Sequence, residues 1–241
     1  MVTVTNLEIL QGLLSLIFCI ISIMVGIKMI LKYVEHKNRT LLWAGISWIL
    51  IISPYFPDAI NLILILTMGI QLNLYIYFLI GAGGLLPFAT ICWIYTMVEL
   101  LWEKEKRLIM SLCIIGELIF FGCFLTFLFI DLSLIGTQIT PFYAEWSIII
   151  AIYLIITIIL FDISGFFFIK KSLKAESKEV TLKARFLAFG LVIFTIGVMM
   201  DTIGGLTEVT LVIARIFVII GCFSFYIGFI LPQFIKNIFL E

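Results

Sequence analysis

The sequence predicts an all-α membrane protein, a bundle of seven transmembrane helices. Hydrophobic residues make up 63% of the 241 residues, charged residues make up 12%, and the mean hydropathy is +1.28. An ordinary soluble domain carries about twice that share of charge, so this much apolar surface requires lipid as its solvent. The apolar runs are continuous, without the alternation of a β-barrel, and about 20–28 residues long, which suits membrane-spanning helices.

Seven such runs follow one another in a single domain over residues 1–241, separated by polar breaks. The expected helices cover roughly residues 9–31, 41–66, 73–102, 107–130, 146–169, 183–206 and 209–231. Many transporters are built from two repeated halves. The two halves of this chain show no convincing repeat, so that architecture has no support from the sequence.

Prolines interrupt two of these runs. Pro54 and Pro57 lie in the second run, and because proline lacks a backbone donor, we expect the outer third of that helix to kink or unwind. In the third run, a glycine-rich stretch at residues 81–84 precedes Pro87. This combination predicts a second distortion near the middle of the membrane.

Lysine and arginine are segregated along the chain. Fourteen of the 15 lie in alternate connections, their flanks and the C-terminal tail, and the opposite connections carry only acids. The cations are Lys28, Lys32, Lys37, Arg39, Lys104, Lys106, Arg107, Lys170, Lys171, Lys174, Lys178, Lys183, Arg185 and Lys236, and the acids are Glu8, Asp58, Asp131, Glu145 and Glu208. Since cytoplasmic loops are rich in Lys and Arg, we expect an outside N-terminus and a cytoplasmic C-terminus in the cell membrane.

Arg215 is the one remaining cation, and it lies within the last apolar run. A tight turn, Gly204 to Glu208, joins this run to the one that contains Asp201. At ~1.5 Å per helical residue, both side chains lie roughly 7–10 Å inside the outer face, and an arginine there needs a partner. Asp201 is the only acid expected at that depth on an adjacent helix, so we expect the charged atoms within ~4 Å of each other.

Two interpretations of this pair stay open. The pair either clamps two helices together or forms the floor of an outward pocket for a carboxylate, a phosphate or another polar ligand. In the second case the pocket lies between the outer halves of the second, third, sixth and seventh helices. Tyr55, Tyr75 and Tyr77 are then candidate ligand-binding residues together with Asp201 and Arg215.

Two further acids lie inside apolar runs, Glu117 in the fourth and Asp162 in the fifth. Neither has an obvious cation at its depth, which favours the protonated carboxylic acid. They are candidates for a proton or cation relay; alternatively, they form hydrogen bonds to neighbouring helices.

Several functional classes lose support from the sequence. A retinal protein needs a lysine in the middle of the last helix, where this chain has Arg215, so we expect no retinal and no other cofactor. One histidine, His36, in a charged loop gives no metal or catalytic set, and we expect no enzymatic activity. The zero net charge suggests no nucleic-acid partner. Expected partners are membrane lipids and, at the basic segment 170–185, anionic lipid or a cytoplasmic signalling protein.

Three short stretches resemble unassigned archaeal seven-helix proteins, which look like the N-terminal seven-helix sensor region of some histidine kinases. They are Pro54-Tyr55-Phe56-Pro57, Asp131-Leu132-Ser133-Leu134-Ile135-Gly136-Thr137 and Phe225-Tyr226-Ile227-Gly228-Phe229-Ile230-Leu231-Pro232. No kinase follows Pro232, so the resemblance implies a stand-alone membrane sensor. The sequence therefore favours a non-enzymatic sensor or receptor-like module, and the alternative is a small transporter or channel that uses Glu117 and Asp162.

Overall fold

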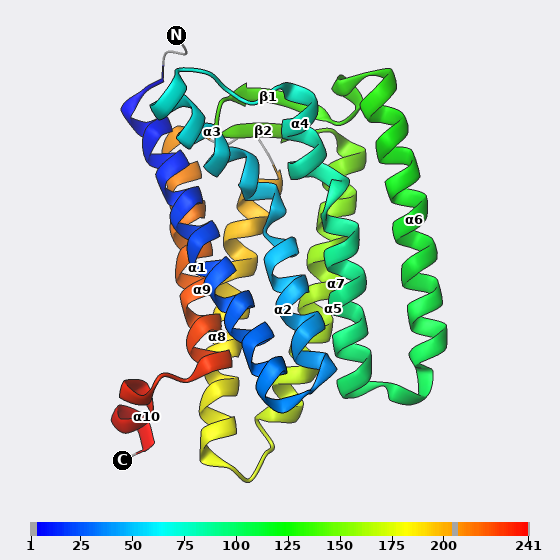
Figure 1. Cartoon of the computed structure of the whole chain (residues 1–241), viewed down its shortest axis with the longest axis vertical. Helices are drawn as coiled ribbons and strands as arrows, with labels where there is room; N and C mark the ends of the chain where they lie inside the picture. The colour runs from blue at the N-terminus through cyan, green and yellow to red at the C-terminus, as the bar shows by residue number, and fades with distance from the viewer. Residues whose placement is uncertain (1–3, 204–206, 241) are drawn as a thin grey trace.

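The computed structural model describes residues 4–203 and 207–240, and this part of the chain contains seven helical spans long and apolar enough to cross a membrane (Figure 1). The helices are α1 (Asn6–His36), α2 (Arg39–Ile51), α3 (Phe56–Met68), α4 (Leu74–Phe78), α5 (Leu86–Leu101), α6 (Lys106–Ile130), α7 (Ile148–Ser172), α8 (Lys178–Ile203), α9 (Glu208–Ile230) and α10 (Gln233–Leu240). Two spans are composite, α2 with α3 and α4 with α5. The predicted seven-helix, all-α frame is thus confirmed, while residues 204–206 of the expected turn lie outside the described residues.

Side-chain caps explain where several helices begin. At the start of α1, the Thr5 hydroxyl accepts from the Glu8 amide and the Glu8 carboxylate accepts from the Thr5 amide, which forms a capping box. Ser147 and Thr207 cap α7 and α9 in the simpler way, by accepting a hydrogen bond from a backbone amide one turn on. These polar residues end the loops and so fix where each apolar run starts.

Both predicted helix distortions are present. The second span is interrupted between α2 and α3 by a 3₁₀ turn, Ser53–Tyr55, where Pro54 and Pro57 remove backbone donors. The third span contains a π-helical segment, Leu79–Gly84, which ends just before α5. A Cβ on Gly83 would lie 2.8 Å from the ring of Phe124, so α6 packs directly against this segment.

A β-hairpin, absent from the sequence prediction, lies between α6 and α7. Strands β1 (Gly136–Thr140) and β2 (Tyr143–Trp146) pair antiparallel, with Gly136 opposite Trp146 and an irregularity between Gln138 and Thr140. Figure 1 shows the hairpin lying across one end of the helix bundle, at the end that also holds α3 and α4. The hairpin therefore covers the space between the helices at that end.

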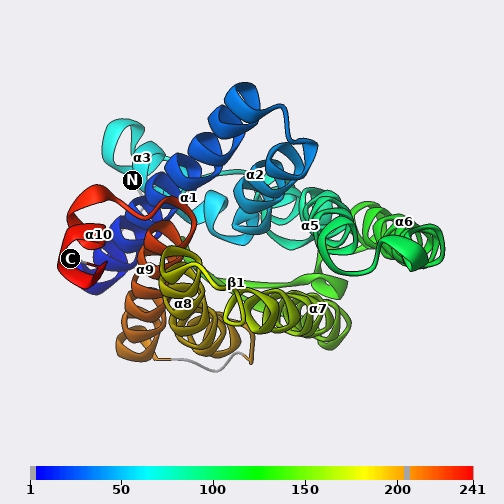
Figure 2. The same ribbon diagram turned by 90° about the horizontal axis from the view of Figure 1, so that it is seen from below.

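The closest helix packing joins α8 to α9 and α1 to α2. A Cβ on Gly221 of α9 would lie 2.8 Å from the Phe194 Cα on α8, and one on Gly26 would lie 2.8 Å from the carbonyl oxygen of Gly45. Glycine lets the backbones approach this closely, as is common between membrane helices. By contrast, α6 lies at the edge of the bundle (Figure 2) and exposes most of its surface.

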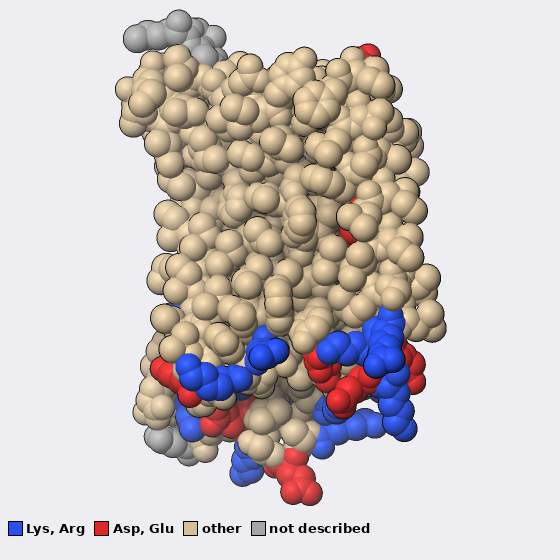
Figure 3. Space-filling view, turned by 45° about the vertical axis from the view of Figure 1, so that its right-hand side comes forward, with Lys and Arg blue, Asp and Glu red and all other residues tan. Residues whose placement is uncertain are grey.

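Charged side chains gather at one end of the molecule (Figure 3). The face in that view shows the Lys and Arg residues together at the lower end, and none of them at the upper end. The short helix α10 lies at the charged end, where Lys236 pairs with Glu179 of α8 at 2.8 Å. The cations that are dispersed in the sequence thus share one end of the fold.

Candidate functional site

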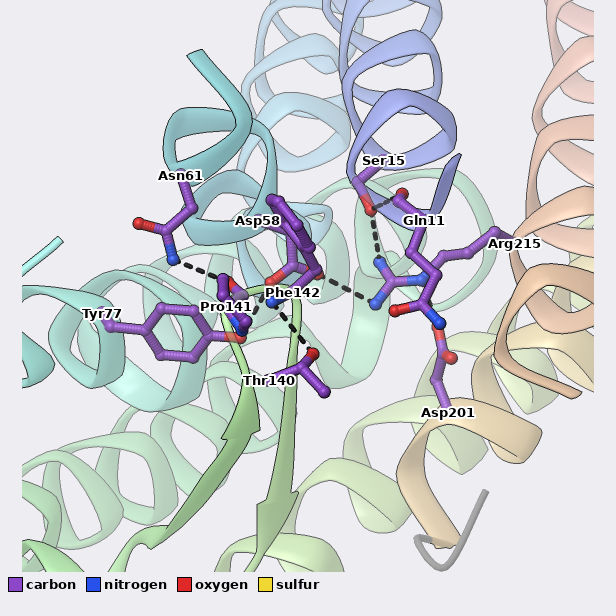
Figure 4. A network of polar contacts seen from close by, with 10 residues as sticks. All are labelled: Gln11, Ser15, Asp58, Asn61, Tyr77, Thr140, Pro141, Phe142, Asp201 and Arg215. Atoms are coloured by element: carbon purple, nitrogen blue, oxygen red, sulfur yellow. Dashed lines mark hydrogen bonds and ion pairs between the residues drawn. The ribbon is translucent and has the colours of Figure 1, made fainter. Parts of the chain in front are cut away.

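Arg215 is the centre of a buried cluster of polar side chains near the end of the bundle that holds the hairpin (Figure 4). The residue is 5% exposed, and its guanidinium donates from Nη1 to the Ser15 hydroxyl and from Nη2 to the Asp58 carboxylate, both at 2.9 Å. The guanidinium carbon also lies 4.4 Å from the centre of the Tyr55 ring. Helices α1, α3 and α9 and the 3₁₀ turn thus meet at one cation, which agrees with the expectation that Arg215 faces the interior.

Asp58 is the acid nearest to Arg215, although only Asp201 was expected at matching depth on an adjacent helix. It is 2% exposed and lies in the first turn of α3, with one carboxylate oxygen on Arg215 and the other accepting from the Tyr77 hydroxyl at 2.7 Å. The expectation failed because the span continues for a full α3 after the proline break. Asp58 lies within the predicted second helix, which was the available signal.

The expected contact between Asp201 and Arg215 is confirmed. The Asp201 carboxylate lies 3.5 Å from Arg215 Nε, and its side chain is 12% exposed. Asp201 is not the sole partner, however, because Asp58 makes the shorter contact at 2.9 Å. The Tyr55 hydroxyl also lies beside the Asp201 carboxylate, but among the described residues no contact of the Asp201 oxygens or of Arg215 Nε has the geometry of a good hydrogen bond.

The three candidate tyrosines lie in different environments. Tyr55 and Tyr77 are buried against Arg215 and Asp58, whereas Tyr75 is 52% exposed and does not line the cavity described below. Residues two apart on a helix point to opposite sides, so Tyr75 and Tyr77 on α4 cannot both face the cluster. Tyr75 is therefore removed from the candidate site.

The hairpin holds α3 in place beside the cluster. The Asn61 side chain donates to the carbonyl of Pro141 at 2.6 Å and accepts from the amide of Leu72 at 2.7 Å. Thr140 accepts from the amide of Phe142 and so shapes the turn of the hairpin. One buried amide side chain thus joins α3, the chain before α4 and the hairpin, and sequence reasoning missed it because the hairpin itself was not predicted.

A cavity borders the cluster. The cavity has a volume of about 820 Å³, which includes space open to solvent. The polar side chains in its wall that could bind a ligand are those of Tyr55, Asp58, Asp162, Thr195, Asp201 and Arg215. Residues of the second, third, sixth and seventh spans line the cavity, as predicted. Residues of α7 also line it, and β2 contributes Ala144 and Trp146, which the sequence did not predict.

Only one of the two candidate relay acids lines this cavity. Asp162 lines it and accepts a hydrogen bond from Thr195 of α8 at 2.7 Å. Glu117 lies on α6, 7% exposed, and accepts from the Tyr153 hydroxyl of α7 at 2.8 Å, away from the lining residues. Both acids thus have the neighbouring-helix hydrogen bonds of the simpler interpretation, and one of them belongs to the cavity.

Comparisons with known proteins add no family. No protein-family model, curated protein or solved structure matches this chain. The class that the fold defines is an integral membrane protein with seven apolar helical spans. Any more specific function rests on the chemistry of the cavity.

Proposed function

We propose that this integral membrane protein is a non-enzymatic sensor or receptor-like module that binds a small molecule in the cavity beside Arg215. The observation that carries the proposal is a buried polar group at the cavity wall whose internal contacts are long. The Asp201 carboxylate lies beside the Tyr55 hydroxyl and 3.5 Å from Arg215 Nε, yet none of these atoms has a hydrogen bond of good geometry to the described residues. Leaving buried polar groups unpaired is costly, so a ligand or water that pairs with them is stabilising.

The helices that line the cavity also suggest how binding is transmitted. Asp162 lies on α7 and Asp201 on α8, and these two helices meet at the basic connection between Ser172 and Lys178. A ligand that changes how α7 packs on α8 changes that connection. We therefore propose the segment 170–185, on the cytoplasmic side, as the contact for anionic lipid or a signalling partner.

The test uses affinity-selection mass spectrometry of purified protein exposed to a metabolite extract. Ala144 lines the cavity and is 4% exposed, so Ala144→Trp fills the space; Ile139→Trp, in the same hairpin but 54% exposed, is the matched control. We expect at least one compound retained by the wild type and by Ile139→Trp and lost from Ala144→Trp, with melting curves confirming that both variants fold. If no compound distinguishes these proteins, the cavity is not a ligand site.

A transporter is the second candidate, and its supporting observation is that Asp162 lies in the cavity wall. A carboxylate between helices is a common feature of ion pathways. Reconstituted vesicles separate the two functions, because a transporter moves the retained compound across the bilayer and a sensor does not. Flux that stops in Asp162→Asn would replace the sensor proposal with the transporter.

A further inference from the structure

The charges at the cavity wall are unequal. Three carboxylates, Asp58, Asp162 and Asp201, line it together with one cation, Arg215. With all four groups ionised the wall has a formal surplus of negative charge, and burial makes an uncompensated charge costly. Of the ligands that the sequence left open, a carboxylate or a phosphate is therefore opposed by the surroundings of Arg215.

Arg215 itself is largely committed to the protein. Nη1 donates to Ser15, Nη2 donates to Asp58 at 2.9 Å, and the Tyr55 ring covers the guanidinium at 4.4 Å. What remains is Nε, 3.5 Å from Asp201. An anion that bound Arg215 would have to compete with two carboxylates already beside it.

Asp201 has the opposite character, because it has capacity to accept hydrogen bonds. Its nearest polar neighbours are the Tyr55 hydroxyl and Arg215 Nε, and neither gives it a hydrogen bond of good geometry, so its oxygens keep acceptor sites at the cavity wall. Aromatic rings surround the remaining space, contributed by Tyr77, Trp146, Phe161 and Phe194. Acceptor oxygens beside aromatic faces are the combination that binds ammonium groups, through charged hydrogen bonds and cation–π attraction.

We propose that the ligand class is a small organic cation, a protonated amine whose N–H groups are bound by Asp201 and whose carbon skeleton packs on the aromatic wall. Asp162, also in the cavity wall and bonded to Thr195, offers a second carboxyl group to the amine. This inference rests on the proposed function, since it names the ligand of the same cavity. It also replaces the carboxylate or phosphate that the lone arginine suggested.

The test measures the charge preference of the cavity with two thiol reagents of equal chemistry. Thr202 lines the cavity beside Asp201 and is 6% exposed. Thr202→Cys is made in the full chain with the five native cysteines replaced by alanine, and Ala144→Cys is a second site from another wall. Intact cells are treated with 2-(trimethylammonium)ethyl or 2-sulfonatoethyl methanethiosulfonate; each forms a mixed disulfide with the thiolate and releases methanesulfinate.

For each cysteine we divide the reaction rate of the cationic reagent by that of the anionic reagent. We expect this ratio to be about tenfold or more higher at the cavity cysteines than at the exposed reference Ser133→Cys. Adding Asp201→Asn should reduce that ratio, whereas adding Glu117→Gln, a buried acid outside the cavity lining, should leave it unchanged.

The failures are distinguishable. A ratio equal to or below the reference, or one that Asp201→Asn leaves intact, would overturn the cation inference while the cavity remains a ligand site. If neither reagent modifies Thr202→Cys or Ala144→Cys although Ser133→Cys reacts, the cavity is closed to solutes, and the proposed function falls with the inference.

Discussion

At the scale of single residues, Arg215 determines the arrangement around it. A guanidinium stays ionised in proteins, so a buried one must be compensated, and here Asp58 and Asp201 lie at 2.9 and 3.5 Å. The two acids are unequal, since the Asp58 side chain is 3% exposed and bonded twice whereas the Asp201 side chain is 12% exposed and lacks hydrogen bonds to the described residues. The cluster thus combines a close, doubly bonded acid with a second acid that lies farther from the guanidinium and is more exposed.

The inequality predicts how substitutions combine. Arg215→Gln leaves two buried carboxylates without their cation, and we expect it to lower the free energy of unfolding by about 3–5 kcal/mol. Asp58→Asn should destabilise more than Asp201→Asn, and the coupling in a double-mutant cycle should be larger for Asp58 with Arg215 than for Asp201 with Arg215. Thermal melts of the purified variants in one detergent measure both.

Additive losses for Asp58 and Arg215 would contradict the ion pair on which the cluster is built. Glu117→Gln serves as the control for these melts, because Glu117 is a buried carboxyl whose partner is the Tyr153 hydroxyl rather than Arg215. Its cycle with Arg215 should show no coupling, since residues without shared partners behave additively.

The sequence could predict only part of this cluster. A lone arginine in an apolar run requires a polar partner. The short connection between the last two helices indicated Asp201 as that partner. Asp58 and Ser15 come from distant parts of the chain. The contact of Asp58 with Arg215 depends on how α3 resumes after the proline break, and that of Ser15 depends on how α1 packs against α9. Tyr77 could not be predicted either, because the π-helical segment separates α4 from α5 and changes the rotation of one relative to the other.

At the scale of elements, local residue types predicted the breaks in two helices but did not predict the hairpin or helix α10. Proline and glycine have local effects on the backbone, so the 3₁₀ turn and the π-helical segment could be expected from residues 54–57 and 81–87. The hairpin β1–β2 and helix α10 depend on packing against other elements. Their sequences lack the long apolar runs that identified the membrane spans, so hydrophobicity could not predict these two elements.

The glycines at the seam of α8 and α9 provide a prediction for helix packing. In Gly221→Ala the new methyl would lie 2.7 Å from the Phe194 Cβ and 2.8 Å from its Cα, so α8 and α9 must separate. We expect a loss of about 1–3 kcal/mol. Gly116→Ala on α6 is the matched control, because nothing lies within 4 Å of its Cβ. Equal melting temperatures for the two variants would show that the seam is looser than described.

One acid of α8, Glu179, forms the ion pair that joins α10 to α8. Glu179 accepts from Lys183 and Lys236, each at 2.8 Å. These groups are partly exposed, so Glu179→Gln should change the overall stability by no more than about 1 kcal/mol. Hydrogen exchange in residues 233–240 should nevertheless become faster, and the exposed Glu176→Gln is the control. Unchanged exchange in Glu179→Gln would mean that apolar contacts alone, such as Phe186 on Phe239, hold α10.

At the scale of the whole molecule, the two ends have different roles. The cations gather at one end, and the hairpin, α3 and the buried cluster occupy the other (Figures 1 and 3). If the positive end is cytoplasmic, then the cavity lies toward the outer face and the helices α7 and α8 join it to the basic connection inside. The orientation in the membrane therefore decides whether the cavity can receive an external ligand.

The most direct measurement of this claim is the sidedness of labelling in the cysteine-free full chain. Ala144→Cys faces the cavity, Ile139→Cys is exposed on the same hairpin, and Lys174→Cys is exposed in the connection between α7 and α8. With a small membrane-impermeant thiol reagent, we predict that Ala144→Cys and Ile139→Cys react in intact cells and that Lys174→Cys reacts only in inverted vesicles. Labelling of Ala144→Cys from the cytoplasmic side alone would contradict an outward ligand cavity.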